Sequence, residues 1–225
     1  IGPRRADLVI APSAHVARDL GRRAVIVPWG RDPRFADEPP PGVVDEVLLG
    51  RYRLSEDPLA LCLGAVRAKK NLVAVLAGLA ELRERKGPRL HAVVTGPETA
   101  DLRRDLGTAS RMGLARYVST PGRIEEEHLP GLVRLAAVVP VLSRSEGFAF
   151  PVLEALASGT PVLVPPDSAQ AELAGDVGIE VDPDDPISVA DGFERALRER
   201  ETGRAKRLAR AAQFPWERAA ASVAE

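Results

Sequence analysis

Two glutamates, Glu146 and Glu154, stand eight residues apart and could together bind hydroxyl groups. An apolar run at 136–142 precedes them and a second run at 162–164 follows, which predicts strand, loop, helix and strand. Glu146 then lies in the loop at the carboxyl end of a strand, and Glu154 lies in the first turn of the helix. At this edge of a parallel sheet, carboxylates can accept hydrogen bonds from sugar or ribose hydroxyl groups. The alternative is that Glu154 only complements its helix dipole and Glu146 is a solvated loop acid.

The helix that carries Glu154 is expected over 151–158. Pro151 suits the first helical position, where a missing N–H costs nothing. Gly159 suits the residue just past the end of the helix.

A second group of residues could bind an anion. Lys69 and Lys70, with Arg67 close by, precede Asn71, which is the expected N-cap of a helix over 72–86. Cations at a helix N-terminus are unfavourable by ~0.3–1 kcal/mol each, whereas a bound anion would reverse that sign. The alternative is that the lysines simply point into water. The chain has neither a GxGxxG nor a GxxxxGK[ST] motif, so a dinucleotide fingerprint and a P-loop are both excluded.

The segment 119–124 is a weaker candidate. Its backbone could line a pocket for a base, but an ordinary turn between strand and helix is at least as good an interpretation.

Composition and charge limit the function further. The net charge of −1 argues against a nucleic-acid-binding surface. A single cysteine, Cys62, excludes an intrachain disulfide and thiolate metal cages, and the three histidines lack metal-binding spacing. No apolar run approaches ~18 residues, so we expect no transmembrane segment and a cytoplasmic setting. The chain does not begin with Met, and we expect it to be a fragment.

Strands and helices are expected to alternate from Leu59 onward, which predicts an α/β fold with a parallel sheet covered by helices on both faces. The expected strands are 59–63, 90–95, 115–118, 136–142, 162–165 and 178–181. The expected helices are 72–86, 98–110, 126–135, 151–158, 186–200 and 203–212, with another restarting at Pro215. Pro140 should cause a bulge or an early end in its strand.

Upstream of Leu59, two short strands and one helix are expected before a linker. Residues 7–11 read as a short buried strand and 24–27 as another, and Ser13 is the expected N-cap of a helix over 14–20. A segment rich in proline and acidic residues, beginning at Asp32, is the best linker candidate.

Taken together, these residues resemble the retaining glycosyltransferases of the GT-B fold, in the large family 4 of group 1 transferases. The segment 143–155 is similar to the family's EGFGLPxLEA signature, and Lys69-Lys70-Asn71 after Gly64 is similar to its G-x5-KN phosphate motif. Weaker similarities lie at 27–32, which resembles the VPxGxD hinge, and at 168–176, 181–183 and 214–216.

The resemblance implies a role for each matching residue. Gly64, Arg67, Lys69 and Lys70 would bind the donor diphosphate, and Glu154 would bind the ribose. Glu146 and the backbone of Gly147, Phe148 and Ala149 would hold the donor sugar, and Arg123 and Ile124 would flank the base. The implied reaction retains the anomeric configuration and needs neither a metal nor a cofactor, because cationic groups and helix-terminus amides neutralise the leaving diphosphate.

The resemblance also divides the chain. Residues 1–35 would end an N-terminal acceptor domain and form a hinge, 36–58 would be a linker, 59–213 would be the Rossmann-like donor domain, and 214–225 would be a helix returning toward the N-terminal domain. The rest of that domain, which in this family supplies acceptor contacts, a catalytic histidine and any peripheral membrane attachment, is expected outside this sequence. The chain alone should therefore bind a nucleotide-sugar donor but turn over little.

Two departures from the family pattern leave other functions open. Ala65 stands where the family commonly has arginine, and Ala149 stands where it has glycine. If position 149 needs a positive φ, alanine would cost ~1 kcal/mol or more. The alternatives are a non-catalytic nucleotide-sugar-binding or interaction module, half of a split transferase, or a nucleotide-sugar epimerase on the same fold.

Overall fold

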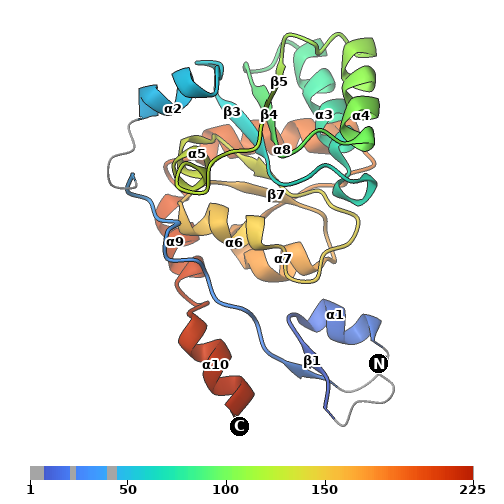
Figure 1. Cartoon of the computed structure of the whole chain (residues 1–225). Helices are drawn as coiled ribbons and strands as arrows, with labels where there is room; N and C mark the ends of the chain where they lie inside the picture. Colours follow the sequence, from blue (N-terminus) through green and yellow to red (C-terminus); the bar gives the residue numbers. More distant parts are fainter. Residues whose placement is uncertain (1–7, 21–23, 40–44, 225) are drawn as a thin grey trace.

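The body of the molecule is a parallel sheet with strand order β5-β4-β3-β6-β7-β8 (Figure 1). The structure is a computed structural model of the 225-residue chain, and it describes residues 8–20, 24–39 and 45–224. The strands are β3 (Leu59–Cys62), β4 (His91–Thr95), β5 (Val118–Gly122), β6 (Val139–Pro140), β7 (Val162–Val164) and β8 (Ile179–Glu180).

The sheet consists of two halves of three strands joined between β3 and β6. The Leu61 N–H donates to the Val138 carbonyl at 2.9 Å, and the Ala137 N–H donates to the Leu59 carbonyl at 2.9 Å. Strand order therefore reverses between β3 and β6. In open parallel sheets this switch point opens a crevice at the carboxyl ends of the strands, where ligands bind.

Strand β6 ends at Pro140, earlier than the 136–142 run, as the proline predicted. The Val139 N–H donates to the carbonyl of Pro161, just before β7, and the Val141 N–H donates to the carbonyl of Leu163 in β7. Successive N–H groups along a strand point to opposite neighbours, so Pro140 removes a donor only from the β3 side. The proline thus weakens the junction of the two halves and leaves the β7 ladder intact.

Strand β5 lies further along the chain than the expected 115–118. Residues Ser119 to Gly122, expected to form a turn, belong to the strand itself. Because β5 is at the edge of the sheet, Pro121 can sit in it without breaking a central ladder.

Helices cover both faces of the sheet, which confirms the predicted Rossmann-like α/β fold. The helices of the body are α3 (Leu72–Glu84), α4 (Ala100–Arg111), α5 (Leu129–Leu135), α6 (Phe150–Ala157), α7 (Ala169–Ala174), α8 (Pro186–Glu199) and α9 (Arg204–Ala211). Helices α3, α4 and α8 share one apolar core, which includes Leu76 and Phe193. Helices α5, α6, α7 and α9 share the other, which includes Leu153 and Leu156. Each of these four side chains is at most 1% exposed, and such burial contributes about 1.5–3 kcal/mol per side chain.

Two short helices were not expected from the sequence. Helix α7 begins after Ser168, whose hydroxyl accepts from the Ala171 N–H at 3.1 Å. Helix α2 (Asp45–Arg51) lies within the interval 36–58 that was expected to be a linker. Its Leu48 is 1% exposed and packs in the same core as α5, so this part of the interval belongs to the body. Residues 40–44 of the expected linker lie outside the described residues.

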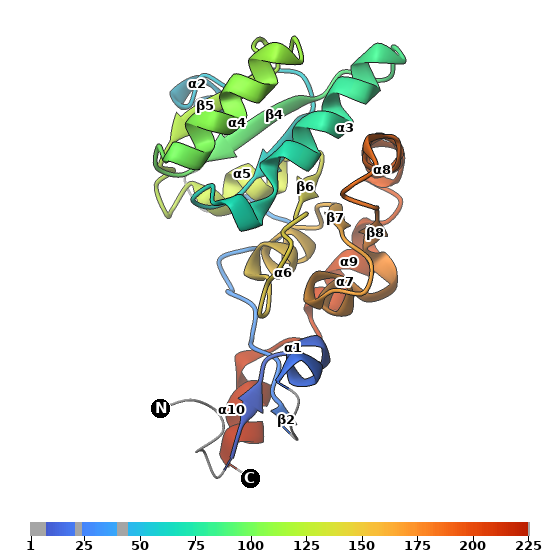
Figure 2. The ribbon, with the colours of Figure 1, turned by 90° about the vertical axis from the view of Figure 1, so that its right-hand side faces the viewer.

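A smaller unit lies below the sheet in Figures 1 and 2 and contains β1 (Ile10–Ala11), α1 (Ala14–Asp19), β2 (Val25–Ile26) and α10 (Trp216–Ala224). Strands β1 and β2 pair in parallel, and Ser13 caps α1 as expected, accepting from the Val16 N–H at 3.2 Å. The expectation that 7–11 is buried is wrong for Leu8 and Ile10, which are 64% and 43% exposed.

Candidate functional site

A cavity of about 450 Å³ opens at the carboxyl ends of β3, β4 and β5. Its lining includes five residues that the sequence marked as site candidates: Gly64, Lys70, Arg123, Ile124 and Glu154. These residues come from three separate segments of the chain, after β3, after β5 and in α6. The cavity also includes residues that sequence analysis missed, namely Leu63, Ala65, Thr95, Gly96, Pro97, Glu126, Leu129 and Pro151. Several of them directly follow strands β3 and β4, and that position is the signal that could have identified them.

Two glycines shape the wall between β3 and β4. Gly64 has φ +100° and Gly96 has φ +107°, in the left-handed region that favours glycine. A Cβ on Gly96 would lie 2.6 Å from the carbonyl oxygen of Gly64, so the two strand ends approach this closely only without a side chain.

Lys70 lines the cavity and forms an ion pair with Glu146, which itself does not line it. Lys70 ends a short 3-10 helix, Ala68–Lys70, and its Nζ lies 2.6 Å from Glu146 Oε1. The side chains are only 24% and 11% exposed. Burial opposes ionisation of Glu146, but hydrogen bonds from Lys70 and Ser143 outweigh it, so the pKa of Glu146 is lowered. The two side chains therefore form a partly buried pair of ammonium and carboxylate groups.

Asn71 directly precedes α3, as expected, but its side chain makes no capping bond. Its backbone is left-handed at φ +53°, and its buried Nδ2 has no hydrogen-bond partner. The predicted position is confirmed and the predicted side-chain cap is wrong, because a left-handed residue aims its side chain away from the helix N–H groups.

Glu154 lines the cavity from the second turn of α6, not the first, because the helix begins at Phe150. Among the described residues, no hydrogen bond to its carboxylate is present. Burial, followed by the charge of Asp32, raises the pKa of Glu154 to about 7, although Arg34 and Lys70 oppose the rise. A carboxyl group in this state gains most from a ligand that donates hydrogen bonds to its ionised form.

The loop between Glu146 and α6 is strained at Ala149, which has φ +61°. Gly147 offers open space beside its Cα, and the Phe148 side chain packs against Trp29 and Phe150, with ring centroids 5.4 and 5.3 Å away. The phenyl ring of Phe148 is thus used in packing, and the carbonyls of Gly147 and Ala149 accept from Ser13 and from the Val152 N–H.

Helix α6 is bounded nearly as expected. Pro151 occupies its second position rather than its first, and Gly159 follows its end with φ +71°.

Two predicted diphosphate residues stand apart from the cavity. Arg67 and Lys69 are exposed and do not line it. Their proposed roles stay predictions.

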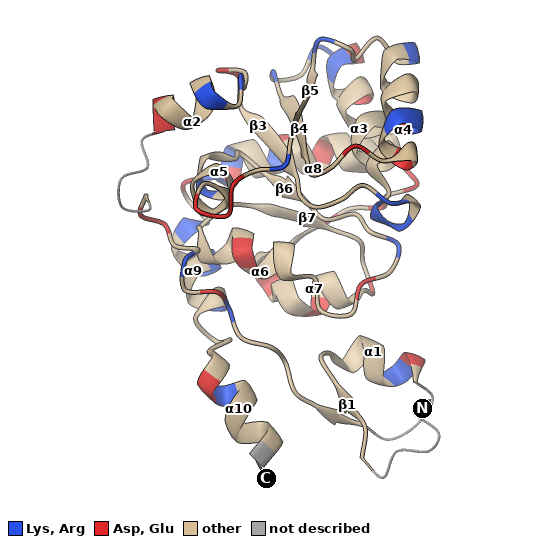
Figure 3. Ribbon diagram, in the orientation of Figure 1, with Lys and Arg blue, Asp and Glu red and all other residues tan. Residues whose placement is uncertain are grey.

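Asp32, in the expected hinge, and Arg34, just after it, lie beside the cavity without lining it. Arg34 holds Asp32 through two nitrogens, at 3.0 and 2.7 Å, and its third nitrogen lies 3.5 Å from Glu126 Oε2. The negative charge of Asp32 also raises the pKa of Glu154. Figure 3 shows basic and acidic stretches close together where this segment passes α6 and α9.

A parallel α/β body with a cavity near its strand-order reversal has the arrangement in which open sheets bind ligands. The chain belongs to the glycosyl transferases of group 1, whose family model matches residues 51–213.

Two similar proteins are mannosyltransferases. The chain is 30% identical to O-antigen chain mannosyltransferase B of Escherichia coli over 76% of its length and 45% of that protein. It is also 30% identical to the GDP-mannose-dependent α-(1-6)-phosphatidylinositol monomannoside mannosyltransferase of Mycobacterium tuberculosis, over 78% of its length and 48% of that protein. The chain thus spans about half the length of these relatives.

A solved structure confirms the fold. Anabaena HepE in complex with UDP and glucose matches 98% of this chain and 63% of its own, with a TM-score of 0.82 and 20% identity. The GT-B-type Rossmann-like fold predicted from the sequence is therefore correct.

The described residues include no helix with the length and apolar character needed to cross a bilayer. The same residues include no group of three or more His, Cys, Asp or Glu side chains placed to hold a metal ion.

Proposed function

We propose that this chain is the donor-binding half of a retaining family 4 glycosyltransferase, transferring a hexosyl group from a nucleotide-diphosphate sugar without a metal. Lys70 and Glu154 line one cavity and Glu146 is paired with Lys70, and this arrangement carries the proposal. The acceptor would be bound by a preceding N-terminal domain, so the chain alone would bind donor and turn over little.

Binding would exchange one ion pair for another. The diphosphate takes Lys70 as its counter-charge, since an ammonium at this position favours an anion. Glu146 is then released from Lys70, and its carboxylate accepts hydrogen bonds from hydroxyl groups of the donor sugar. The ribose donates to Glu154, and the base lies beside Arg123 and Ile124.

The reaction would proceed on one face of the sugar. The bond between the anomeric carbon and the diphosphate oxygen breaks, and the acceptor oxygen bonds to the same face. The acceptor proton passes to the departing diphosphate oxygen, whose developing charge Lys70 stabilises.

The names of the relatives agree with this donor class. One mannosyltransferase is described as GDP-mannose-dependent, and HepE was solved with UDP and glucose. GDP-mannose is a nucleotide-sugar donor and UDP is the nucleotide that such a donor releases, so both belong to the class of ligand that the cavity would bind.

Calorimetry with GDP-mannose, UDP-glucose and ADP-glucose tests the proposal. We expect the wild-type chain to bind at least one donor. Lys70→Ala should weaken that binding by about tenfold to a hundredfold, because a charge-assisted contact is worth about 1.5–3 kcal/mol. Lys206→Ala removes an exposed lysine on α9 and should change nothing.

Lys70→Ala leaves Glu146 without its partner, so a second variant guards against misfolding. The pair Lys70→Met with Glu146→Gln removes both charges together and should fold while still losing affinity. A folded wild-type chain that binds none of the three donors would refute the proposed function.

A further inference from the structure

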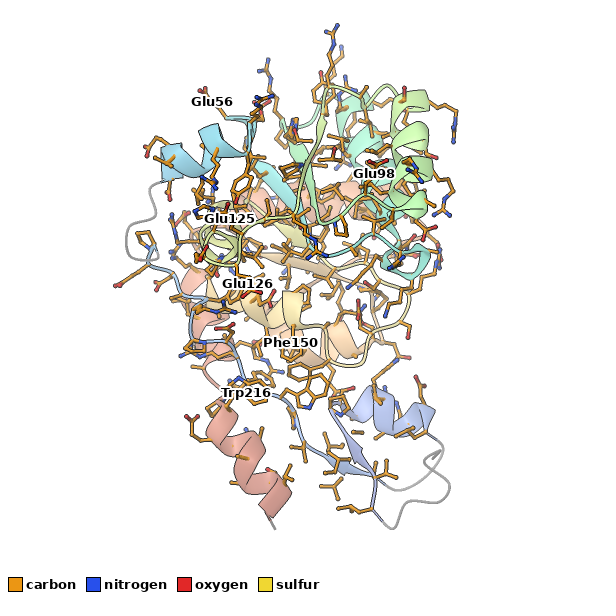
Figure 4. All side chains as sticks on the ribbon, in the orientation of Figure 1. Glu56, Glu98, Glu125, Glu126, Phe150 and Trp216 are labelled. Carbon is orange, nitrogen blue, oxygen red and sulfur yellow. The ribbon has the colours of Figure 1, made fainter. Side chains whose placement is uncertain are left out.

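A second cavity lies where the body meets the lower unit. Its volume is about 260 Å³, and its wall includes Pro12 of the lower unit and Leu173 of α7. Figure 4 shows Phe150 at the start of α6 and Trp216 at the start of α10 on the two sides of this junction. The cavity shares no lining residue with the one at the carboxyl ends of β3, β4 and β5. Junctions between structural units are a common place for small-molecule sites.

Two arginines line this cavity without a carboxylate partner. All their hydrogen bonds to described residues go to carbonyl or amide oxygens. Arg210 caps the end of α7 through the carbonyls of Glu172 and Leu173, at 2.8 and 3.0 Å, and donates to the Gln213 side chain at 2.9 Å. Arg218, in the first turn of α10, makes one long contact of 3.5 Å. A guanidinium has five N–H donors and is always charged, so both arginines keep unused donors and positive charge.

The acceptors in the wall are already occupied. Glu172 is the one acidic residue that lines the cavity, and its carboxylate accepts from the Ala14 and His15 N–H groups at 2.7 and 2.8 Å. The Ser13 hydroxyl donates to the Gly147 carbonyl at 3.2 Å. The cavity therefore offers donors and positive charge to a ligand, which favours an anion.

The directions and surroundings of these donors favour a phosphate with an apolar body. Arg210, Gln213 and Arg218 follow one another from the end of α9 into α10, so they approach a ligand from separate places. A carboxylate accepts in one plane, whereas a phosphate ester presents three oxygens in different directions. Beside them, the half-buried Phe214 meets the buried Phe148 edge-on, with ring centroids 6.4 Å apart. This aromatic corner suits a small apolar group.

We propose that this cavity binds a small phosphate monoester. Arg210, Gln213 and Arg218 bind the phosphate group, and the apolar body lies against Phe214. Because the wall comes from both units, the bound ligand holds the lower unit against the body. The site is independent of the donor cavity and does not involve Lys70.

Calorimetry of the whole chain with phenyl phosphate, inorganic phosphate and benzoate tests this site. Phenyl phosphate should bind at least about tenfold tighter than either of the others, because inorganic phosphate lacks the apolar body and benzoate lacks the third oxygen. Arg218→Gln should weaken phenyl phosphate binding about tenfold and leave the binding of nucleotide sugars unchanged. Phe214→Leu should weaken the binding of phenyl phosphate but not of inorganic phosphate.

Arg198→Gln is the matched control, because Arg198 is an exposed arginine on α8 that does not line the cavity. It should leave all three affinities unchanged. Equal effects of Arg198→Gln and Arg218→Gln, or a folded chain that does not bind phenyl phosphate, would overturn the proposed site. Benzoate binding as tightly as phenyl phosphate would overturn the phosphate assignment. Loss of phenyl phosphate binding in Lys70→Ala would place that ligand in the donor cavity and would also overturn the site, without refuting the proposed function.

Discussion

At the scale of single residues, two carboxylates of the candidate site, Glu146 and Glu154, are in opposite electrostatic states. Glu146 is kept ionised by Lys70 at 2.6 Å, whereas burial and the nearby Asp32 raise the pKa of Glu154 to about 7. One acid is therefore charged before a ligand arrives, and the other changes charge near neutral pH. A ligand that donates hydrogen bonds to Glu154 must compete with a proton.

That competition predicts pH-dependent binding. Donor affinity should rise by up to about tenfold between about pH 6 and about pH 8, as the ionised fraction of Glu154 rises from roughly a tenth to roughly nine tenths. A nucleotide-diphosphate sugar is the suitable probe, because its diphosphate does not titrate in this range. Calorimetry across the range measures the slope.

Glu154→Gln is the control for that slope. Its affinity should be lower and flat across the same pH range, because the amide cannot ionise. The variant should also lose a stability trend of the wild type. The folded wild type keeps its proton between the ordinary value of 4.5 and about 7, so its stability should fall as pH rises through that interval. If the pH dependence of donor affinity were the same in Glu154→Gln as in the wild type, another group would be responsible for it.

At the scale of elements, the cavity depends on how closely β3 and β4 end beside each other. The carbonyl of Gly64 occupies the space that a Cβ on Gly96 would fill, at 2.6 Å. Both glycines have positive φ, so each bend has a conformational requirement. Only Gly96 has a steric requirement as well, because a Cβ on Gly64 would meet nothing nearer than Lys70 Cε at 4.0 Å.

Gly96→Ala should therefore lower the free energy of unfolding by at least about 2 kcal/mol, from the left-handed strain and the backbone clash. It should also weaken nucleotide binding. Gly50→Ala is a matched change in α2, where a Cβ meets nothing within 4 Å, and it should stabilise by up to about 1 kcal/mol. Denaturant midpoints at constant slope measure both. Equal midpoints for the two variants would contradict this account of the wall.

Sequence patterns predicted the long elements well and the short ones poorly. The apolar stripe of α3 and the buried runs of β4 and β7 have only one good interpretation, so their positions were found to within a few residues. Helices α2 and α7 have 7 and 6 residues, too few for a clear helical period. Strand β5 was misplaced because Pro121 and Gly122 are typical of turns, and only its place at the sheet edge lets them extend the strand.

At the scale of the whole molecule, the unit below the sheet is hydrogen-bonded to α7 and to the loop that follows Glu146. The Glu172 carboxylate accepts from the Ala14 and His15 N–H groups at 2.7 and 2.8 Å. Ser13 donates to the Gly147 carbonyl at 3.2 Å, beside Glu146. The lower unit therefore rests on the same loop that carries the proposed sugar-binding residues.

Residues 29–31, which follow the lower unit's β2, also pack on residues 214–216, which lead into α10. The Arg31 N–H donates to the Phe214 carbonyl at 2.7 Å, and a Cβ on Gly30 would lie 2.4 Å from Trp216. Trp29 stacks on Phe150, at the start of α6, with centroids 5.3 Å apart. Contacts of this kind join residues more than a hundred positions apart, so no local pattern could have predicted that Asp32 acts on Glu154.

The central claim is that Lys70 binds the diphosphate and Glu154 binds the ribose of one nucleotide. A crystal structure of the chain with GDP tests this claim most directly. The account predicts that Lys70 Nζ leaves Glu146 and lies within about 3.2 Å of a phosphate oxygen, while Glu154 accepts from a ribose hydroxyl. A nucleotide bound elsewhere, with the ion pair between Lys70 and Glu146 intact, would contradict it.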